Sequence, residues 1–393
     1  MTASVNQKRP PISAAPRGLY VHIPFCRHRC WYCDFAVVTG QEPLADRYLA
    51  ALAAEWERQR ASVTGLAPLA SVFIGGGTPT QLAPAQLARL LAITRQGVGW
   101  LPDVEVSIEA NPEGFTAEKL DALVQGGVTR VSLGGQSFHP RHLQFLERQH
   151  TAAELIAAIQ QVQQAGLRVA VDLIFGIPGQ TLADWQRDLD AVIALGVDHV
   201  STYGLTFEKG TRLWKARYQG QVEPIANEIE AQMYELAMAH LPAAGLDQYE
   251  LSNFARAGQE CRHNERYWAN EPYFGIGLGA ARYLAGTRSV NTRSLAGYLQ
   301  RCQAGEDPVQ AAETLPPLER ARETAMLNLR RIRGIDRATF ADQTGYGLDE
   351  LLGATLPRLV RQGLLADSGR AVALTPAGRL LADEVMGEVL VPA

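Results

Sequence analysis

Apolar residues follow two spacings along residues 18–241. Short continuous apolar stretches, typical of buried strands, alternate with longer stretches in which apolar residues recur every three or four positions, as on one helix face. The first strand precedes Cys26, and a helix carrying Leu44 to Trp56 follows the cysteines. Five further strands are predicted at Ser71–Thr78, Val104–Ala110, Val128–Gln136, Arg168–Phe175 and Val197–Phe207.

Capping residues place the helices between these strands. Thr116 caps one helix, and two capping boxes, Thr151 with Glu154 and Thr181 with Asp184, open two others. Strands that alternate with helices favour a parallel α/β sheet, either an open doubly wound sheet or a barrel. Polar residues at the carboxyl ends of the strands then mark the candidate site: Thr78, Glu109, Gln136, Asp172 and Tyr203.

The pattern changes from Leu315 onward. Helices are predicted at Ala321–Arg331, Asp336–Thr344 and Leu348–Gln362, and a short strand pair follows, as in a winged-helix-like module. Arg330, Arg331, Arg333 and Arg337 make DNA binding one interpretation. We favour a lid or docking domain, because the charge of this segment is mixed. The glycine run Gly275–Gly279 follows no clear strand and predicts no dinucleotide site.

Composition narrows the function classes. The chain has 393 residues, which favours one large domain with a smaller one, and a net charge of −4, which argues against nucleic acid as a partner. No apolar run reaches the ~18 residues of a membrane span. Residues 1–17 hold three basic and no acidic residues and no apolar signal core, so we expect a disordered tail and a cytoplasmic protein.

Cys26, Cys30 and Cys33 are the strongest chemical signal. Their C-x3-C-x2-C spacing suits a 4Fe–4S cluster in which three thiolates bind three irons and the fourth iron stays open to a small chelating molecule. Tetrahedral zinc is the alternative, with His22 or His28 nearby, but no second cysteine pair follows. His22 otherwise fits a strand histidine with both partners satisfied, or one that influences the cluster's redox behaviour.

The stretch YVHIPFCRHRCWYCDF resembles the cluster loop of the radical S-adenosylmethionine (SAM) superfamily, and within it the oxygen-independent coproporphyrinogen III dehydrogenases and their relatives. The resemblance implies a partial (β/α)6 TIM-like barrel, a 4Fe–4S cluster and SAM bound to the open iron. It also implies that SAM is cleaved to a 5′-deoxyadenosyl radical. The positions that match the family's cofactor-binding residues are Tyr20, Tyr32, Gly76, Gly77, Thr78, Glu109, Gln136, Arg148, Asp172 and Gly204. Backbone groups of the glycine motif would meet the methionine part of SAM.

A second motif separates two branches of this superfamily. Cys261-Arg-His-Asn-Glu-Arg-Tyr-Trp268 resembles the H-N-x-x-Y-W motif of the heme chaperone HemW family. This resemblance implies that His263 is an axial heme ligand, with Cys261 the alternative, and that Asn264, Tyr267 and Trp268 orient or pack against the heme. Cys302 looks incidental. Phe35 stands where the dehydrogenases carry a fourth cysteine, and the segment before the first strand is short, which argues against decarboxylation.

The sequence therefore predicts four regions and one leading function. The regions are a tail at 1–17, a radical SAM core at 18–260, a heme-motif segment at 261–314 and a winged-helix-like domain at 315–393. The expected function is a heme chaperone that passes heme to an acceptor protein. Oxygen-independent coproporphyrinogen III oxidation is the enzymatic alternative. Radical-SAM modification of RNA is a third reading, which the missing basic patch disfavours.

Overall fold

The computed structural model describes residues 15–391, so the predicted tail lies outside the described residues except at 15–17. Strand β1 (Gly18–Ile23) occupies the middle of a 12-stranded sheet, parallel to β2 (Leu69–Gly76) on one side and to β9 (Tyr273–Ile276) on the other. Beyond β2 the sheet continues in parallel through β3 (Trp100–Ala110), β4 (Arg130–Gln136), β5 (Arg168–Phe175) and β6 (His199–Gly204).

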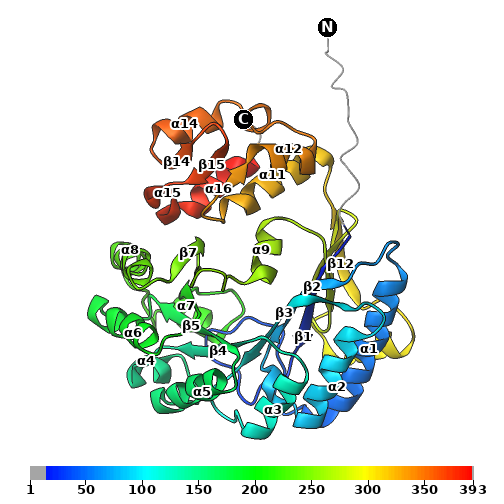
Figure 1. The fold of residues 1–393 in the computed structure, drawn as a ribbon. Coiled ribbons are helices and arrows are strands. Elements are labelled where there is room, and N and C mark those ends of the chain that lie inside the picture. Colours follow the sequence, from blue (N-terminus) through cyan, green and yellow to red (C-terminus); the bar gives the residue numbers. More distant parts are fainter. Residues whose placement is uncertain (1–14, 392–393) are drawn as a thin grey trace.

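Helices cover the outer side of this curved sheet (Figure 1). They are α1 (Ala45–Ala61), α2 (Pro84–Arg95), α3 (Ala117–Gln125), α4 (Pro140–Phe145), α5 (Ala152–Gln164), α6 (Leu182–Ala194) and α8 (Asn227–Ala243). The predicted N-cap at Thr116 and both predicted capping boxes are confirmed, and each cap satisfies backbone N–H groups that a helix start leaves without partners.

Strand β6 does not pair with β1, so the six parallel strands form an incomplete barrel. On its other side, β6 pairs with the antiparallel strand β8 (Asn253–Ala255), which in turn pairs with β7 (Asp247–Glu250). The predicted fold class, a partial (β/α)6 barrel with a small C-terminal domain, is confirmed. One continuous cluster of buried hydrophobic residues forms its core and includes the fully buried Leu19, Val21 and Ile23 of β1.

The segment after the barrel adds strands that the sequence pattern did not show. Strand β9 is followed by β10 (Ala281–Leu284), β11 (Thr287–Asn291), α10 (Leu295–Gln303) and β12 (Val309–Thr314). The glycine run Gly275–Gly279, which we expected to follow no clear strand, begins inside a strand, because Gly275 lies within β9. A Cβ at Gly275 would lie 1.8 Å from the carbonyl oxygen of Ala281, so the close approach of β9 and β10 requires glycine there.

The C-terminal domain has a hydrophobic core of its own, built on Leu329, Phe340, Leu359 and Val389. It contains α11 (Pro317–Leu329), β13 (Ile335–Asp336), α12 (Arg337–Thr344), α13 (Leu348–Leu352), α14 (Thr355–Arg361), β14 (Leu365–Asp367), β15 (Ala371–Leu374), α15 (Pro376–Leu380) and α16 (Ala382–Leu390). The single helix predicted at Leu348–Gln362 is two, because the chain turns at Gly353 with a positive φ of 49°.

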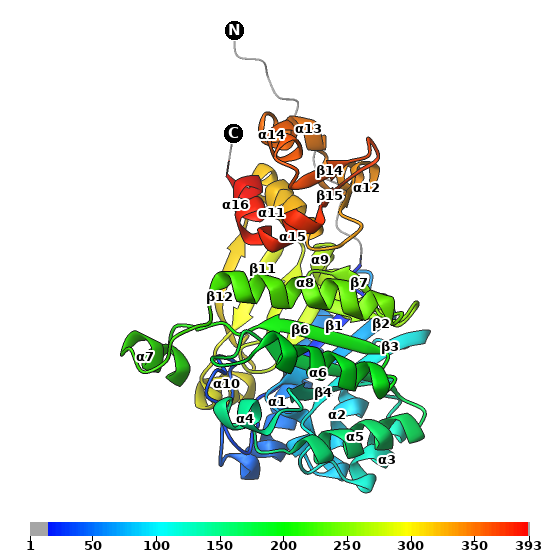
Figure 2. The ribbon, with the colours of Figure 1, turned by 90° about the vertical axis from the view of Figure 1, so that its left-hand side faces the viewer.

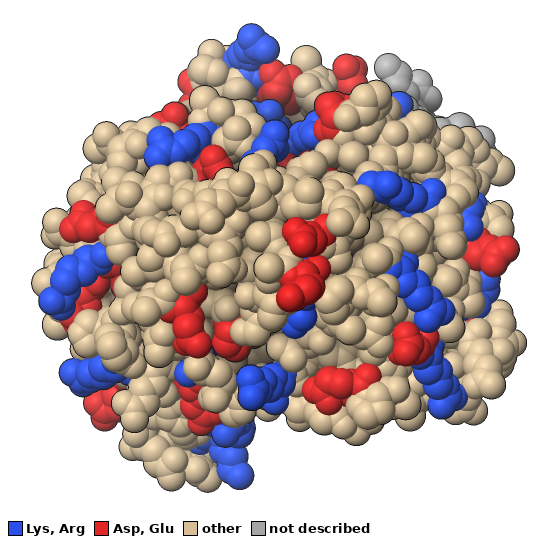
Figure 3. All heavy atoms as spheres, turned by 60° about the horizontal axis from the view of Figure 1, so that its bottom comes forward, with Lys and Arg blue, Asp and Glu red and all other residues tan. Residues whose placement is uncertain are grey.

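Figures 1 and 2 both place the C-terminal domain over one end of the sheet, with α9 (Arg262–Trp268) between them. None of the helices in residues 15–391 is both long and apolar enough to cross a membrane. On the face shown in Figure 3, basic and acidic side chains are interspersed and form no continuous basic surface.

Candidate functional site

The cluster loop leaves the carboxyl end of β1 and folds back on itself. The amide of Cys26 donates to the carbonyl of Val38 at 2.9 Å, and the amide of Val38 donates to the carbonyl of Pro24 at 2.8 Å. Cys26 is buried, whereas Cys30 and Cys33 are partly exposed. Burial raises the pKa of the Cys26 thiol to about 12, so its thiolate forms readily only when a metal binds.

A chain of hydrogen bonds joins the first cysteine to the second. The Cys26 Sγ lies 3.6 Å from the Thr78 hydroxyl, which accepts from the side-chain amide of Asn111 at 3.1 Å. The Asn111 carbonyl accepts from Arg148 at 2.8 Å, and the same guanidinium donates to the Cys30 Sγ at 3.5 Å. Donors aimed at cysteine sulfur stabilise metal-bound thiolates. Asn111 was not predicted, because its place directly after β3 and before a proline reads as a turn.

The cluster loop carries three cysteine side chains, the number expected for a 4Fe–4S cluster that leaves one iron without a protein ligand. No set of three His, Cys, Asp or Glu side chains within residues 15–391 is close enough to hold one metal ion. In a cubane cluster each cysteine binds a different iron, so the sulfur atoms are spread more widely than around one tetrahedral zinc. The donor set therefore suits a 4Fe–4S cluster with three protein ligands.

The loop is also held from outside. Glu147 of the segment after α4 contacts His28 at 3.1 Å and pairs with Arg212, at the start of α7 (Arg212–Tyr218). Arg212 also donates to the carbonyl of Arg29 at 3.0 Å. The Trp31 ring packs edge-on against Phe145 at 5.1 Å. These contacts hold the cluster loop on its outer side, as the hydrogen bonds of Thr78, Asn111 and Arg148 do on its inner side.

Two carboxylates lie near the carboxyl ends of β3 and β5, the strands on either side of β4. Glu109, on β3, accepts the amide of Gly76 at 2.8 Å, and Asp172, on β5, lies 3.4 Å from the Ser132 hydroxyl. Burial, with the nearby Asp172 charge, raises the pKa of Glu109 to about 7. Burial also raises the pKa of Asp172 to about 6. A cationic group of a ligand would find two carboxylates here whose ionised forms lack a strong partner.

The glycine motif brings β2 close to the start of the cluster loop. The amides of Gly76, Gly77 and Thr78 all donate to protein oxygens, the last two to the carbonyls of Ile23 and Phe25 at 2.8 Å. These N–H groups are hydrogen-bonded within the protein, and the contact of the motif's backbone with the methionine part of SAM stays a prediction. A Cβ at Gly76 would lie 2.3 Å from the His22 ring, so the glycines let β2 approach the start of the cluster loop.

The remaining matched positions lie around the same edge. Gln136 ends β4 with a φ of 62°, a left-handed conformation that is costly for a residue with a side chain and is concentrated at functional sites. Tyr32 is half-buried in the loop beside Arg148 and Asp172, whose charges act on its hydroxyl. Gly204 ends β6, where a Cβ would lie 2.9 Å from the Glu230 carboxylate.

The H-N-x-x-Y-W motif forms α9 at the opposite ends of the strands. His263 is fully buried, with Nδ1 3.0 Å from the Ser71 hydroxyl and Nε2 2.9 Å from the Tyr267 hydroxyl. Burial lowers the pKa of His263 to about 3, so the imidazole is neutral. Both ring nitrogens of His263 are hydrogen-bonded, so neither is free to bind iron as the expected axial heme ligand. Iron ligation would require breaking one of these bonds.

Cys261 is also buried, whereas Asn264, Tyr267 and Trp268 are partly buried. The Cys261 thiol lies 3.6 Å from Glu105, and burial raises its pKa to about 12. Trp268 lies beneath the guanidinium of Arg330, 4.3 Å from the ring centroid. Asn264 is partly buried on α9.

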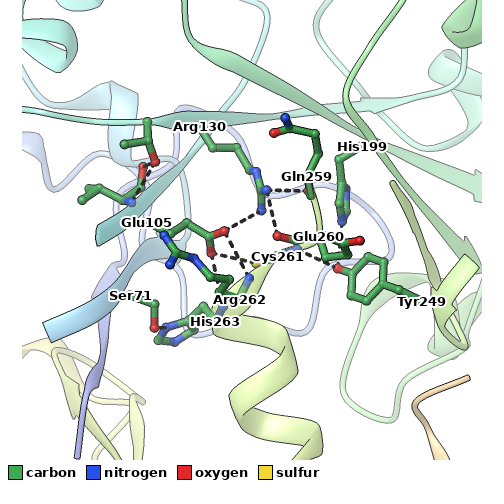
Figure 4. Close-up of polar contacts among 12 residues, drawn as sticks. Ser71, Glu105, Arg130, His199, Tyr249, Gln259, Glu260, Cys261, Arg262 and His263 are labelled. Atoms are coloured by element: carbon green, nitrogen blue, oxygen red, sulfur yellow. Dashed lines mark hydrogen bonds and ion pairs between the residues drawn. The ribbon is translucent and has the colours of Figure 1, made fainter. Parts of the chain in front are cut away.

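Glu105, on β3, positions this helix (Figure 4). Its carboxylate accepts the amides of Arg262 and His263 at 3.1 and 3.2 Å, which satisfies the N-terminus of α9, and lies 3.4 Å from the Arg130 guanidinium. Both charged side chains are 1% exposed. Sequence reasoning missed this pair, since neither residue stands at a carboxyl strand end.

Aromatic rings in the barrel connect the cluster loop at one end of the strands with α9 at the other end. The Tyr20 hydroxyl lies 3.0 Å from His22 Nδ1, and the other nitrogen of that ring lies 2.9 Å from the carbonyl of Ala36 in the cluster loop. Tyr20 stacks on Phe73 at 6.4 Å between centroids, and Phe73 stacks on His263 at 5.6 Å. Thus Tyr20, predicted beside the cluster, lies between the cluster loop and α9.

Comparison with known proteins agrees with this architecture. The Radical SAM superfamily matches residues 20–192, and the HemN C-terminal domain matches residues 315–381. The crystal structure of coproporphyrinogen III oxidase (HemN) from Escherichia coli shares the fold, with a TM-score of 0.83 over 95% of this chain and 90% of that chain, at 24% identity.

Curated relatives cover the whole length. "Heme chaperone HemW" of Bacillus subtilis is 38% identical over 95% of this chain and 99% of that protein. The protein of the same name from Mycobacterium tuberculosis is 39% identical over 97% and 96%. "Radical S-adenosyl methionine domain-containing protein 1, mitochondrial" of Bos taurus is 33% identical over 97% and 89%. The chain belongs to the heme chaperone HemW family of the radical SAM superfamily.

Proposed function

We propose that this protein is a heme chaperone, which binds heme as cargo and delivers it to an acceptor protein. The observation that carries the proposal is the identity of 38–39% with proteins named heme chaperone HemW, sustained over 95–97% of this chain. The likeness therefore includes the cluster loop, α9 and the C-terminal domain together.

In this proposal the cluster and the heme occupy opposite ends of the strands. The cluster loop follows Ile23 of β1, whereas α9 packs against Ser71, which pairs with Gly18 at the start of β1. Gly76 lies five positions after Ser71 in the strand, roughly 16 Å away at the usual rise per residue. Each site can therefore be removed without dismantling the other.

Cys26, Cys30 and Cys33 would hold the cluster, with Thr78 and Arg148 donating toward its thiolates. When bound, such a cluster supplies a transferable electron and an open iron for SAM. Glu109, Asp172 and Gln136 would contact SAM, and Tyr32 and Gly204 would border it. Glu109 and Asp172 would each stabilise the positive charge of SAM, because burial leaves both ionised carboxylates poorly solvated unless a cation lies beside them.

Oxygen-independent coproporphyrinogen III oxidation remains the alternative. The similarity to HemN from Escherichia coli, at 24% identity, shows a shared fold and carries no argument about the reaction. Phe35, 57% exposed in the cluster loop, occupies the place where the dehydrogenases are expected to carry a fourth cysteine. This substitution favours the chaperone.

The test is an anaerobic titration of the reconstituted protein with hemin, followed by its Soret absorption, beside an assay with coproporphyrinogen III. We expect about one heme per chain, transfer of that heme to an apo heme protein, and no protoporphyrinogen IX. Rapid conversion of coproporphyrinogen III would contradict the chaperone proposal. So would the absence of heme binding.

A further inference from the structure

A cleft of about 1510 Å³ lies between the core sheet and the C-terminal domain. On the core side it is lined by the β10–β11 hairpin and by residues 269–272, which directly follow α9. On the other side it is lined by α11, α12 and the loop between them. Ligand pockets usually measure roughly 300–1,000 Å³, so this cleft has room for a large planar molecule. Apolar contacts come from Val63, Pro272, Tyr283 and Leu284.

The cleft is rich in arginine. Its lining includes Arg282, Arg320, Arg331, Arg333 and Arg370. Three of them are paired with carboxylates, namely Arg282 with Asp307, Arg333 with Glu265, and Arg370 with Asp336. Within residues 15–391, neither Arg320 nor Arg331 forms an ion pair. Of the carboxylates in the lining, Glu271 and Asp336 are already paired, and Asp342 is exposed.

Arg331 is the unusual member of this group. It is only 8% exposed, and its Nε is buried without a hydrogen-bond partner in the described part of the chain. Two carboxylates whose charges act on Arg331, Glu265 and Glu271, are bound to Arg333 and Arg266. A buried guanidinium without an anion is unfavourable, so it marks a place where an anionic group is stabilised.

The backbone holds Arg331 in place. Its neighbours on both sides are hydrogen-bonded to the strand β7 region, since Leu251 donates to the carbonyl of Arg330 and Ile332 donates to the carbonyl of Tyr249, both at 3.0 Å. The side chain of Arg330 faces Glu250 and Trp268, whereas that of Arg331 lines the cleft. The cation is thus preorganised for a ligand.

We propose that this cleft is the heme site, with Arg331 and Arg320 pairing with the propionate carboxylates and the apolar residues contacting the macrocycle. The assignment rests on the proposed heme-chaperone function. A planar apolar ring with two carboxylates uses both the arginines and the apolar lining, whereas a small anion such as phosphate would use only the arginines. The site needs no iron ligand from His263.

The test compares two ligands on the full-length protein. Hemin carries free propionates, and its dimethyl ester lacks their charge. In Arg331→Gln we expect the Kd for hemin to rise about tenfold or more, as for a lost charge-assisted hydrogen bond, while the Kd for the ester matches that of the wild type. Arg358→Gln removes one positive charge from the same domain, outside the cleft, and should leave both Kd values unchanged.

Arg320→Gln provides a second variant at a partly exposed position, so the test does not depend on the folding of Arg331→Gln. A rise in Kd for hemin alone in this variant also supports the assignment. Wild-type affinity for hemin in both variants would overturn the assignment of the cleft as the heme site and leave the chaperone proposal standing. Equal losses for hemin and the ester would also overturn it, because they would show a structural effect. A wild type that binds no hemin would overturn both proposals.

Discussion

At the scale of single residues, Glu109 and Asp172 lie near the carboxyl ends of their strands, and burial raises the pKa of both carboxyl groups. The pKa of Glu109 lies at about 7 in the folded chain, above its ordinary value of 4.5. A raised carboxyl pKa means that the folded state binds the proton more tightly than the unfolded state. The resulting stabilisation is complete below about pH 4.5 and is lost as the pH rises through about 7.

This sign leads to a prediction for Glu109→Gln. The glutamine still accepts the Gly76 amide but carries no charge, so its thermal midpoint relative to wild type should increase from pH 5 to about pH 7 and level off above that pH. Melting curves of protein without cluster or SAM measure this difference. The exposed Glu223→Gln provides the control, with a constant difference expected across the range. A pH-independent difference for Glu109→Gln would show that its carboxyl titrates normally.

For single residues, the sequence predicts where a side chain lies in the fold better than it predicts the side chains with which it forms hydrogen bonds. Glu109 and Asp172 could be placed at one edge because parallel strands bring their carboxyl ends together. Asn111, in contrast, joins the two cysteine contacts through Thr78 and Arg148, three segments that are distant in the sequence. No local pattern encodes such a network. The same holds for His263, whose hydrogen-bond partner Ser71 is 192 positions away.

At the scale of elements, α9 depends on one buried carboxylate. Glu105→Ala removes the acceptor of two α9 amides and leaves Arg130 buried without its anion. We expect the free energy of unfolding to fall by about 3–5 kcal/mol, measured by denaturant titration. The exposed Glu223→Ala should change it by less than about 0.5 kcal/mol. Replacing both partners, as Glu105→Leu with Arg130→Met, should restore much of the loss; equal stability of Glu105→Ala and wild type would contradict this account.

The elements themselves were predictable where the pattern is long. Strand β5 has the predicted bounds, Arg168–Phe175, because apolar residues fill six of its eight positions and glycines, Gly166 and Gly176, lie on either side of it. Strand β9 has only four residues and includes Gly275, so its pattern is weak. Its partner is β1, more than 250 residues earlier in the chain, and only tertiary pairing makes it a strand.

For the whole molecule, Arg330 joins the C-terminal domain to the core. Its guanidinium lies 3.6 Å from Glu250, which is fully buried, and covers Trp268. Arg330→Ala should therefore lower the free energy of unfolding by about 1–3 kcal/mol and speed hydrogen exchange in α9 and α11. Arg358→Ala, in the same domain, should leave exchange in α9 unchanged. Identical exchange in the two variants would mean that the domains are held by other contacts.

The central claim is that the cluster and the heme bind at opposite ends of the strands. The most direct measurement is heme binding by the triple variant Cys26→Ala/Cys30→Ala/Cys33→Ala, followed by Soret absorption beside iron and sulfide analysis. The account predicts no cluster and about one heme per chain, with a Kd close to that of the wild type. Loss of heme binding together with the cluster, in a variant that keeps the wild-type circular dichroism spectrum, would contradict it.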